Sequence, residues 1–485
     1  MPEAWVQTNL VEIVDILDSQ RVPINNKERQ ERLSGAAHTY PYYGATGKVG
    51  EIDDYIFDGQ SVLLGEDGAP FLEPRKAKAY LVSGKYWVNN HAHILRGNGV
   101  VENAFLCHQL NTLDYREYVS GTTRLKLTQA SLKDLRIKLP PLNEQRRIVE
   151  KIETLFARLD QGEAALRHTQ TLLARYRQSV LKAAVTGALT ADWRAANAHR
   201  LEHGRDLLAR ILQTRRETWQ GRGQYQEAAA PDTSNLPELP EGWVWASVGQ
   251  LTSIKGGVTV DKKREATDPV TLPYLRVANV QNGYLDLAQV KEITVDRQKA
   301  EQCLLEPGDI LLNEGGDRDK LGRGWVWDGE ISPCIHQNHV FRARPVLLEI
   351  SSKFISYYAN AFGQPFFMTK GKQSVNLASI SLTAISGLPV PLPPVDEQHE
   401  IVTALEERLS EIAAASDISK TELTRSAALR QSILKDAFAG KLVPQDPSDE
   451  PAADLLARIR ASRTTPSGRV GKAQRAHAAP TTDAR

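Results

Sequence analysis

The residues best suited to chemistry are a glycine-rich stretch and a histidine pair, and neither forms a recognisable active site. GATGKVG at 44–50 has Tyr42 where a phosphate-binding P-loop needs a glycine. His91 and His93 would share one face of a strand and could bind a metal, but the similar segment NHVFRAR has Phe341 in place of His93. A hydrogen-bonded structural role is the preferred interpretation of these histidines. The sequence predicts no catalytic residue, no metal site and no cofactor in this chain.

Two polar loops carry the residue types that DNA recognition requires. Bases are read by Arg, Lys, Asn, Gln, Ser and Thr on exposed loops, while phosphates accept from lysine, arginine, hydroxyl and amide donors. SGTTRLK at 120–126 and TKGKQSVN at 369–376 are such loops. The candidate DNA contacts are Thr122, Thr123, Arg124, Lys126, Lys370, Lys372, Gln373, Ser374 and Asn376. Weaker candidates are Tyr42, Thr46, Lys48, Arg318, Lys320 and Arg323. An ordinary solvated turn remains the alternative for each loop.

The chain contains two copies of one unit, about 2–216 and 240–463. LPPLNEQRRIVEKIE returns as LPPVDEQHEIVTALE, and SVLKAAVTGALT returns as SILKDAFAGKLV, both at an offset of 253 residues. At smaller offsets, PEAWV pairs with PEGWV, NHAHILR with NHVFRAR, LLGEDG with LLNEGG, and DLLARI occurs twice. Chance similarity of helical segments does not explain six matches in one order. The two polar loops occupy equivalent places in the two copies.

Each copy contains a long amphipathic helix. Asn143 and Asp396 stand where helix N-caps are expected, and Glu144 and Glu397 suit the positive end of the helix dipole. Apolar residues then recur at spacings of three and four, until a glycine able to adopt a left-handed conformation ends each helix, at Gly187 and Gly440. About 45 residues correspond to roughly 65–70 Å, and so long a stripe needs a partner. We expect the two helices to pair as an antiparallel coiled coil, the alternative being that each packs on its own domain.

The segments before the helices predict two compact α/β or α+β domains. Short β-type runs, such as 86–95 and 335–343, alternate with turn residues, and short helices such as 352–362 lie between them. One more helix is expected over 191–215, followed by a linker. The predicted parts are a first domain (1–140), a central long helix (141–190), a helix and linker (191–239), a second domain (240–392), a distal long helix (393–443), and a short helix with a disordered tail (444–485).

Composition excludes several classes of protein. The chain has 485 residues, 41% of them hydrophobic and 25% charged, which is typical of a multidomain globular protein. We find no apolar run long enough to span a membrane and no secretion signal, and the three cysteines suit a reducing cytoplasm, so we expect a cytoplasmic protein. The formal net charge of +1 argues against a solitary non-specific DNA binder. It permits a sequence reader that shares phosphate contacts with partner subunits.

The chain resembles specificity subunits of type I restriction-modification systems in four sequence features. These are the LPP-x-x-EQ segment at the start of each long helix, the SxLKxAxxGxL segment near its end, YPYYGATG (40–47) and PYLRVANV (273–280). The resemblance covers nearly the whole chain. It implies an α+β fold with two tandem target-recognition domains, separated by two long helices that pair as an antiparallel coiled coil, in a pseudo-two-fold internal repeat.

The same resemblance implies a non-catalytic subunit. Each recognition domain would bind one half of a bipartite, asymmetric double-stranded DNA target. The helices would set the spacer and dock two DNA adenine methyltransferase subunits. The methyl donor and ATP are expected only in the methyltransferase and the restriction and translocase subunits. The alternative function is a coiled-coil adaptor that binds proteins without reading DNA.

Overall fold

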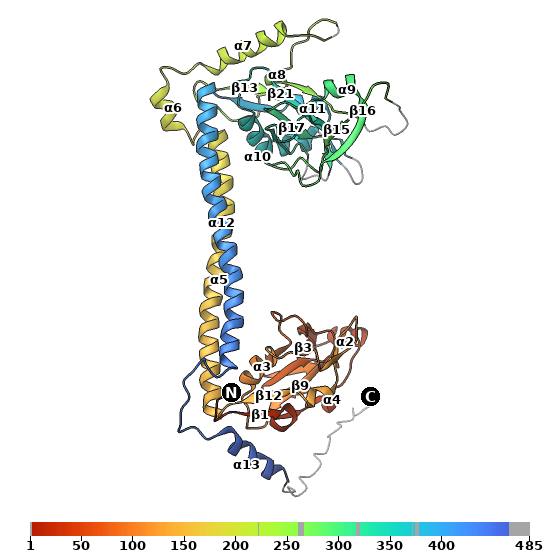
Figure 1. Ribbon diagram of the computed structural model, residues 1–485, viewed down its shortest axis with the longest axis vertical. Coiled ribbons are helices and arrows are strands. Elements are labelled where there is room, and N and C mark those ends of the chain that lie inside the picture. The colour runs from red at the N-terminus through yellow and green to blue at the C-terminus, as the bar shows by residue number, and fades with distance from the viewer. Residues whose placement is uncertain are drawn as a thin grey trace, which may run out of the picture. The chain divides into compact units, whose positions relative to one another are not determined.

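The computed structural model describes residues 2–221, 223–259, 266–316, 321–370, 372–373 and 378–464 (Figure 1). The chain forms two compact units. Unit 1 contains residues 1–167 and the chain from 420 onward, and unit 2 contains 168–419. Each unit therefore combines one globular domain with helical segments from both sequence copies. Among the described residues, no helix has the length and hydropathy that crossing a bilayer requires.

Two four-stranded sheets form the globular part of unit 1. Their strand orders are β2-β9-β6-β7 and β4-β3-β8-β5, and a buried cluster that includes Leu63, Tyr86 and Ile94 joins them. Strand β6 is buried at every position, as its continuous apolar run SVLLG favours for a central strand. The strands are β1 (Val6–Asn9), β2 (Val14–Ile16), β3 (Tyr40–Gly44), β4 (Gly47–Ile52), β5 (Phe57–Asp58), β6 (Ser61–Gly65), β7 (Ala79–Val82), β8 (Lys85–Val88), β9 (Ala92–Gly97), β10 (Val119–Ser120), β11 (Lys126–Leu127) and β12 (Arg136–Leu139). The shorter helical elements are α1 (Leu10–Ile13), η1 (Asp18–Gln20), α2 (Asn26–Leu33), α3 (Asn103–Leu110) and α4 (Gln129–Lys133).

Unit 2 repeats this architecture. One sheet has the order β14-β21-β17-β19, a three-stranded sheet has the order β16-β15-β20, and β13 pairs with β24 as β1 pairs with β12. The strands are β13 (Val244–Ser247), β14 (Thr252–Lys255), β15 (Pro269–Leu275), β16 (Lys291–Asp296), β17 (Asp309–Asn313), β18 (Gly315–Gly316), β19 (Gly324–Trp327), β20 (Ile335–His336), β21 (Val340–Pro345), β22 (Lys372–Gln373), β23 (Ala378–Ser379) and β24 (Pro389–Leu392). The shorter helices are α8 (Val248–Leu251), α9 (Arg297–Gln302), α10 (Ser352–Lys370) and α11 (Leu382–Ser386). The repeat seen in the sequence is therefore a repeat of the fold.

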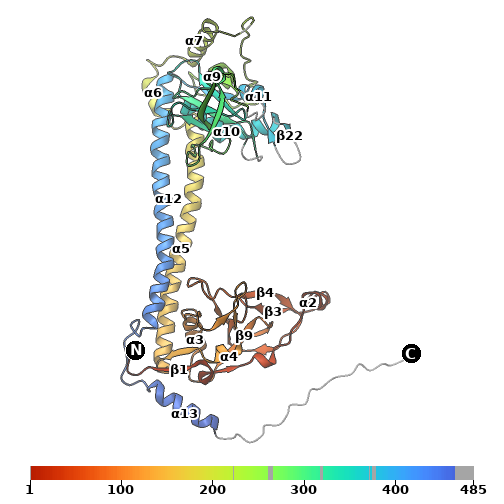
Figure 2. The ribbon, with the colours of Figure 1, turned by 45° about the vertical axis from the view of Figure 1, so that its right-hand side comes forward.

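The long helices are α5 (Leu142–Val185) and α12 (Val395–Ala437), and their segments lie side by side within each unit (Figures 1 and 2). In unit 1, Ile148 and Ile152 share a core with Ile433 and Phe438. In unit 2, residues near the end of α5, such as Val180, share a core with residues near the start of α12. The start of one helix thus meets the end of the other, so the predicted antiparallel pairing is confirmed.

The predicted N-caps are wrong by two residues. The carbonyls of Pro141 and Pro394 accept the first helical hydrogen bonds, from Gln145 and Gln398, so Asn143 and Asp396 lie inside the first turns. The prolines can take this place because a proline lacks only an amide that the helix start does not use. The predicted helix ends are confirmed, because Gly187 and Gly440 have φ values of +74° and +73°.

Buried hydrogen bonds at each helix start explain why the two LPP-x-x-EQ segments share one spacing. Trp5 Nε1 donates to Glu144 at 3.0 Å, and Trp243 Nε1 donates to Glu397 at 2.8 Å. The neighbouring Gln145 accepts from the Glu102 amide and donates to two carbonyls, which joins α5 to the loop before α3. These carboxylates therefore act through specific hydrogen bonds in addition to any favourable interaction with the helix dipole.

The segments that follow the long helices return to the two domains. The single helix predicted over 191–215 is wrong, because the chain forms α6 (Ala191–Asn197) and α7 (Gly204–Glu217), with the His203 side chain capping the second. Helix α7 packs in unit 2, and α13 (Ala452–Thr464) packs in unit 1. The tail predicted to be disordered lies, beyond residue 464, outside the described residues.

Candidate nucleic-acid interface

Both polar loops adjoin a pair of short antiparallel strands, and these pairs lie at equivalent places in the two units. Hairpin 1 (residues 119–127) pairs β10 with β11, and hairpin 2, described at residues 372–373 and 378–379, pairs β22 with β23. Each hairpin rests on the turn that follows the central strand of its main sheet. The Leu127 amide donates to the Glu66 carbonyl in unit 1, and the Ile380 amide donates to the Glu314 carbonyl in unit 2.

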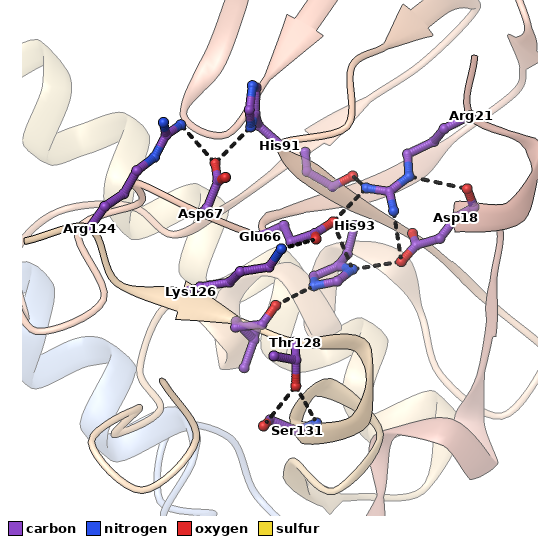
Figure 3. Close-up of polar contacts among 12 residues, drawn as sticks. Asp18, Arg21, Glu66, Asp67, His91, His93, Arg124, Lys126, Thr128 and Ser131 are labelled. Carbon is purple, nitrogen blue, oxygen red and sulfur yellow. Dashed lines mark hydrogen bonds and ion pairs between the residues drawn. The ribbon is translucent and has the colours of Figure 1, made fainter. Parts of the chain in front are cut away.

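Hairpin 1 presents all four of its predicted DNA contacts to solvent. Thr122, Thr123, Arg124 and Lys126 are exposed at or beside its turn. Arg124 Nη2 lies 2.9 Å from Asp67 Oδ1, and Lys126 Nζ lies 3.3 Å from Glu66 Oε1. The two cations are therefore accessible and are already paired with acids from the turn beneath them (Figure 3).

The second loop is described in part. Lys370 is exposed at the end of α10, and the backbone of Lys372 and Gln373 forms β22. The predicted contacts Ser374 and Asn376 lie outside the described residues, as do Arg318 and Lys320. Arg323 is described and is partly buried beside the start of β19.

The weaker candidates of unit 1 divide into buried and exposed residues. Thr46 and Lys48 are exposed at the turn between β3 and β4, where Lys48 is paired with Glu51. Tyr42 is buried in a cluster with Ile52 and Trp87, and its hydroxyl faces the carbonyl of Ile24. The suggestion that Tyr42 contacts DNA is therefore corrected, because its ring fills the interior of the sheet.

A buried network of ionisable side chains supports hairpin 1. His93 Nδ1 lies 2.6 Å from Asp18 Oδ2, and its Nε2 lies 2.8 Å from the carbonyl oxygen of Leu127 in β11. Both ring nitrogens of His93 therefore face oxygen atoms. Arg21 Nη1 donates to Glu66 Oε2 at 2.7 Å and to the Ala92 carbonyl at 3.0 Å. The network thus connects the core of the sheet to the strand that carries Lys126 (Figure 3).

The expectation that His91 and His93 share a strand face is wrong. A turn separates β8 from β9, so His93 is buried in β9 while His91 precedes the strand and is partly exposed. His91 Nδ1 lies 2.8 Å from Asp67 Oδ1. In unit 2 the equivalent His339 lies 2.6 Å from Glu314. A histidine paired with an acid of this turn is therefore a feature of both units.

The network also accounts for the one described group of side chains with metal-ligand spacing. Ligand atoms of Asp18, Glu66 and His93 lie within 4.8 Å of one another. The Glu66 carboxylate contacts Arg21 and Lys126, and the Asp18 carboxylate contacts His93. These contacts are those of ion pairs. Burial raises the pKa of Asp18, but the hydrogen bond and charge of His93, the Ile94 amide and Arg21 outweigh it, so the pKa of this carboxyl lies below its usual value. These contacts give the group an electrostatic role, the support of hairpin 1.

Sequence reasoning missed the acids beneath the hairpins. Glu66 and Asp67 lie in LLGEDG, and Glu314 lies in LLNEGG. The repetition of these segments was informative, but it does not show that a loop some 60 residues later folds back onto them. An acid that directly follows a buried strand in both copies was the available signal.

The comparisons with known proteins agree with this architecture. The family model for the type I restriction modification DNA specificity domain matches residues 2–166 and 240–422, which is more than half of the chain. The chain belongs to the specificity subunits of type I restriction-modification systems. Hairpin 1 lies in the first of its DNA specificity domains and hairpin 2 in the second.

Relatives of the specificity subunit match along most of its length. The StySPI specificity subunit of Salmonella potsdam is 28% identical over 391 residues, which cover 77% of this chain and 75% of the relative. The EcoDI specificity subunit of Escherichia coli is 24% identical over 483 residues, which cover 97% of both chains. The HsdS subunit from Thermoanaerobacter tengcongensis has a similar fold, with 19% identity, a TM-score of 0.53, and coverage of 91% of this chain and 98% of that one. A chain from a structure of type I system assembly and conformational transition gives 19% identity, a TM-score of 0.58, and coverage of 91% and 99%.

Proposed function

We propose that this specificity subunit is a non-catalytic reader of a bipartite DNA target, with hairpin 1 contacting one half-site and hairpin 2 the other. The observation that carries the proposal is the same hairpin on the same turn in both specificity domains. Each hairpin exposes, or places beside it, residue types that read bases or bind phosphates. Because the two loops differ in sequence, the half-sites are expected to differ, which makes the target asymmetric.

The long helices are proposed to set the unread spacer between the half-sites. With 44 and 43 residues they are each roughly 65 Å long at 1.5 Å per residue. Each helix belongs partly to unit 1 and partly to unit 2, so both domains are attached to the same pair of helices. The domain boundaries proposed for the readers remain 1–140 and 240–392, with the helices and linkers between and after them.

Methylation, translocation and cleavage are proposed to belong to partner subunits. Two DNA adenine methyltransferase subunits would dock on the helices, and restriction subunits would join them, with the methyl donor and ATP bound by these partners. Tyr176 of α5 and Leu429 of α12 are large apolar side chains about half exposed, and they are related by the repeat offset of 253 residues. Two equivalent apolar positions suit two copies of one partner.

The test is base-resolution methylome mapping after co-expression with the methyltransferase subunit of the same system. The expected result is a split, asymmetric motif. Replacement of residues 240–385 by those of a relative should change one half of the motif and leave the other half and the spacer unchanged. A contiguous motif, or methylation that does not depend on this chain, would exclude the proposal in favour of a protein-binding adaptor.

A further inference from the structure

We propose that Arg124 reads a guanine in the half-site bound by unit 1, and that Asp67 is the residue that positions Arg124 for this contact. The inference rests on the proposed function, and it specifies one base contact within it. It also assigns a role in DNA reading to an acid, a residue type that repels the phosphates of DNA.

The geometry places the acid behind the cation. The side chain of Arg124 is 60% exposed, whereas that of Asp67 is 20% exposed. A Cβ atom added to Gly68 would lie 3.2 Å from Arg124 Nε, so the guanidinium lies across the backbone of that glycine. His91 contacts the same Asp67 oxygen from the other side. Asp67 therefore holds one nitrogen of the guanidinium, as Figure 3 shows, while most of the Arg124 side chain stays exposed.

The chemistry of the guanidinium favours a base over a phosphate. Arginine has five N–H donors in a rigid fork, and Asp67 accepts from one nitrogen, Nη2. The remaining donors can bond the N7 and O6 acceptors that guanine presents in the major groove. The carboxylate offsets the positive charge that attracts a phosphate and would itself repel the phosphate. The Asp67 carboxylate leaves the other N–H groups of Arg124 available to a neutral base edge. It also restricts the rotamers that Arg124 can adopt.

Two comparisons within the chain sharpen the assignment. Lys126 on the same hairpin is also paired with an acid, but a lysine is a point charge with no planar fork and suits phosphate better. In unit 2, Gly315 stands at the place of Asp67 and Ser379 at the place of Lys126, as the strand pairings show. Gly315 has no side chain that could position a cation as Asp67 does, so we assign this guanine contact to the half-site bound by unit 1.

The experiment compares Arg124→Ala, Asp67→Asn, Asp67→Glu and Lys126→Ala in the co-expressed methyltransferase complex, with methylome mapping. Arg124→Ala should lower the preference for guanine at one position of one half-site by roughly 5- to 150-fold. Asp67→Asn should relax the same position by less, and Asp67→Glu, which keeps the carboxylate, should restore part of the preference. Lys126→Ala, the matched control, should weaken all target sites alike. Thermal unfolding checks that the variants fold, and Arg124→Lys replaces Arg124→Ala if that variant does not fold.

A binding assay gives an independent readout. In duplexes with 7-deazaguanine at the identified position, N7 is absent, so binding by the wild-type complex should fall while binding by the Arg124→Ala complex should not change. A uniform loss of methylation in Arg124→Ala would overturn the base contact and leave the proposed function intact. Unchanged selectivity in Asp67→Asn, with selectivity lost in Arg124→Ala, would overturn the role of Asp67. Methylation independent of this chain would overturn the proposed function itself.

Discussion

Replacing Glu397 by glutamine would break a buried set of hydrogen bonds at the start of α12. Glu397 is fully buried, and its Oε1 accepts from Thr190 Oγ1 at 2.9 Å and from Arg194 Nη1 at 2.7 Å. Its Oε2 accepts from Trp243 Nε1 at 2.8 Å. A glutamine has one oxygen and one NH₂ group, so in either orientation at least one donor faces another donor.

The cost follows from these contacts. A buried donor left without an acceptor costs about 1–3 kcal/mol. Arg194, whose side chain is 18% exposed, also loses its negative partner. Breaking a fully buried ion pair costs roughly 3–5 kcal/mol, and the partial exposure of Arg194 reduces this to about 1–2 kcal/mol. We expect Glu397→Gln to destabilise unit 2 by about 3 kcal/mol, a decrease in Tm of roughly 6–12 °C.

Glu144→Gln is the matched control from unit 1. Trp5 Nε1 and Gln445 Nε2 both donate to Oε1 of Glu144, so the oxygen of a glutamine can retain both bonds. Burial raises the pKa of Glu144, so removing its charge also removes a desolvation cost. The expected loss is below about 1 kcal/mol. Calorimetry measures both variants, and hydrogen exchange at β13, β24 and the start of α12 locates the effect. Equal losses in the two variants, or an unchanged Tm in Glu397→Gln, would refute the reasoning.

Further predictions concern the helix ends and the network beneath hairpin 1. Gly187→Ala should lower the free energy of unfolding by at least about 1–2 kcal/mol, because φ is positive at this residue and the new Cβ would lie 2.7 Å from Pro240 Cγ. Gly162→Ala is the control: this glycine lies within α5 with open space around it, so the alanine should slightly raise the Tm. The pKa of Asp18 in the folded protein lies below its usual value of 3.8. The contribution of this carboxylate to stability is therefore complete above that pH and is lost as the pH falls through the folded-state pKa. The free energy of unfolding of the wild type should therefore exceed that of Asp18→Asn by a constant amount near neutrality, and this difference should shrink below about pH 4. Because the pKa of Glu144 is raised, the stability of the wild type relative to Glu144→Gln should instead increase as the pH falls. A pH-independent advantage over Asp18→Asn in urea titrations would contradict the assignment of the Asp18 shift.

The two long helices and the internal repeat could be predicted because the sequence patterns that indicate them are local and occur twice. The apolar spacing of α5 and α12, their terminal glycines and the offset of 253 residues require no knowledge of tertiary structure. The wrong predictions fall where a short irregular segment redirects the chain. A turn at Asn89–His91 divides one predicted strand into β8 and β9, and the break between α6 and α7 divides one predicted helix. The prediction for Tyr42 is wrong because the residue is close in sequence to the turn at 45–46, whereas its neighbours in space are Ile52 and Trp87.

The candidate site was predictable in its cations and not in their partners. A loop of exposed threonine, arginine and lysine is visible in the sequence at 120–126, but the acids that meet it lie some 60 residues earlier. Only folding brings the turn after β6 beneath β11, through the backbone bond from Leu127 to Glu66. Long-range pairing of this kind leaves no periodic signal along the chain.

The acids beneath hairpin 1 also reconcile a net charge of +1 with a role in reading DNA. Non-specific affinity comes from cations that displace counterions from phosphates, and Arg124 and Lys126 are each offset by a carboxylate before DNA arrives. Such a hairpin contributes little to binding of random sequence, yet its donors still distinguish one base edge from another. Under the proposed function, the phosphate contacts that hold the complex on DNA would then come largely from partner subunits. We therefore expect the isolated specificity subunit to bind even its own target weakly. Most of the salt dependence of binding should appear only when the proposed methyltransferase subunits are added.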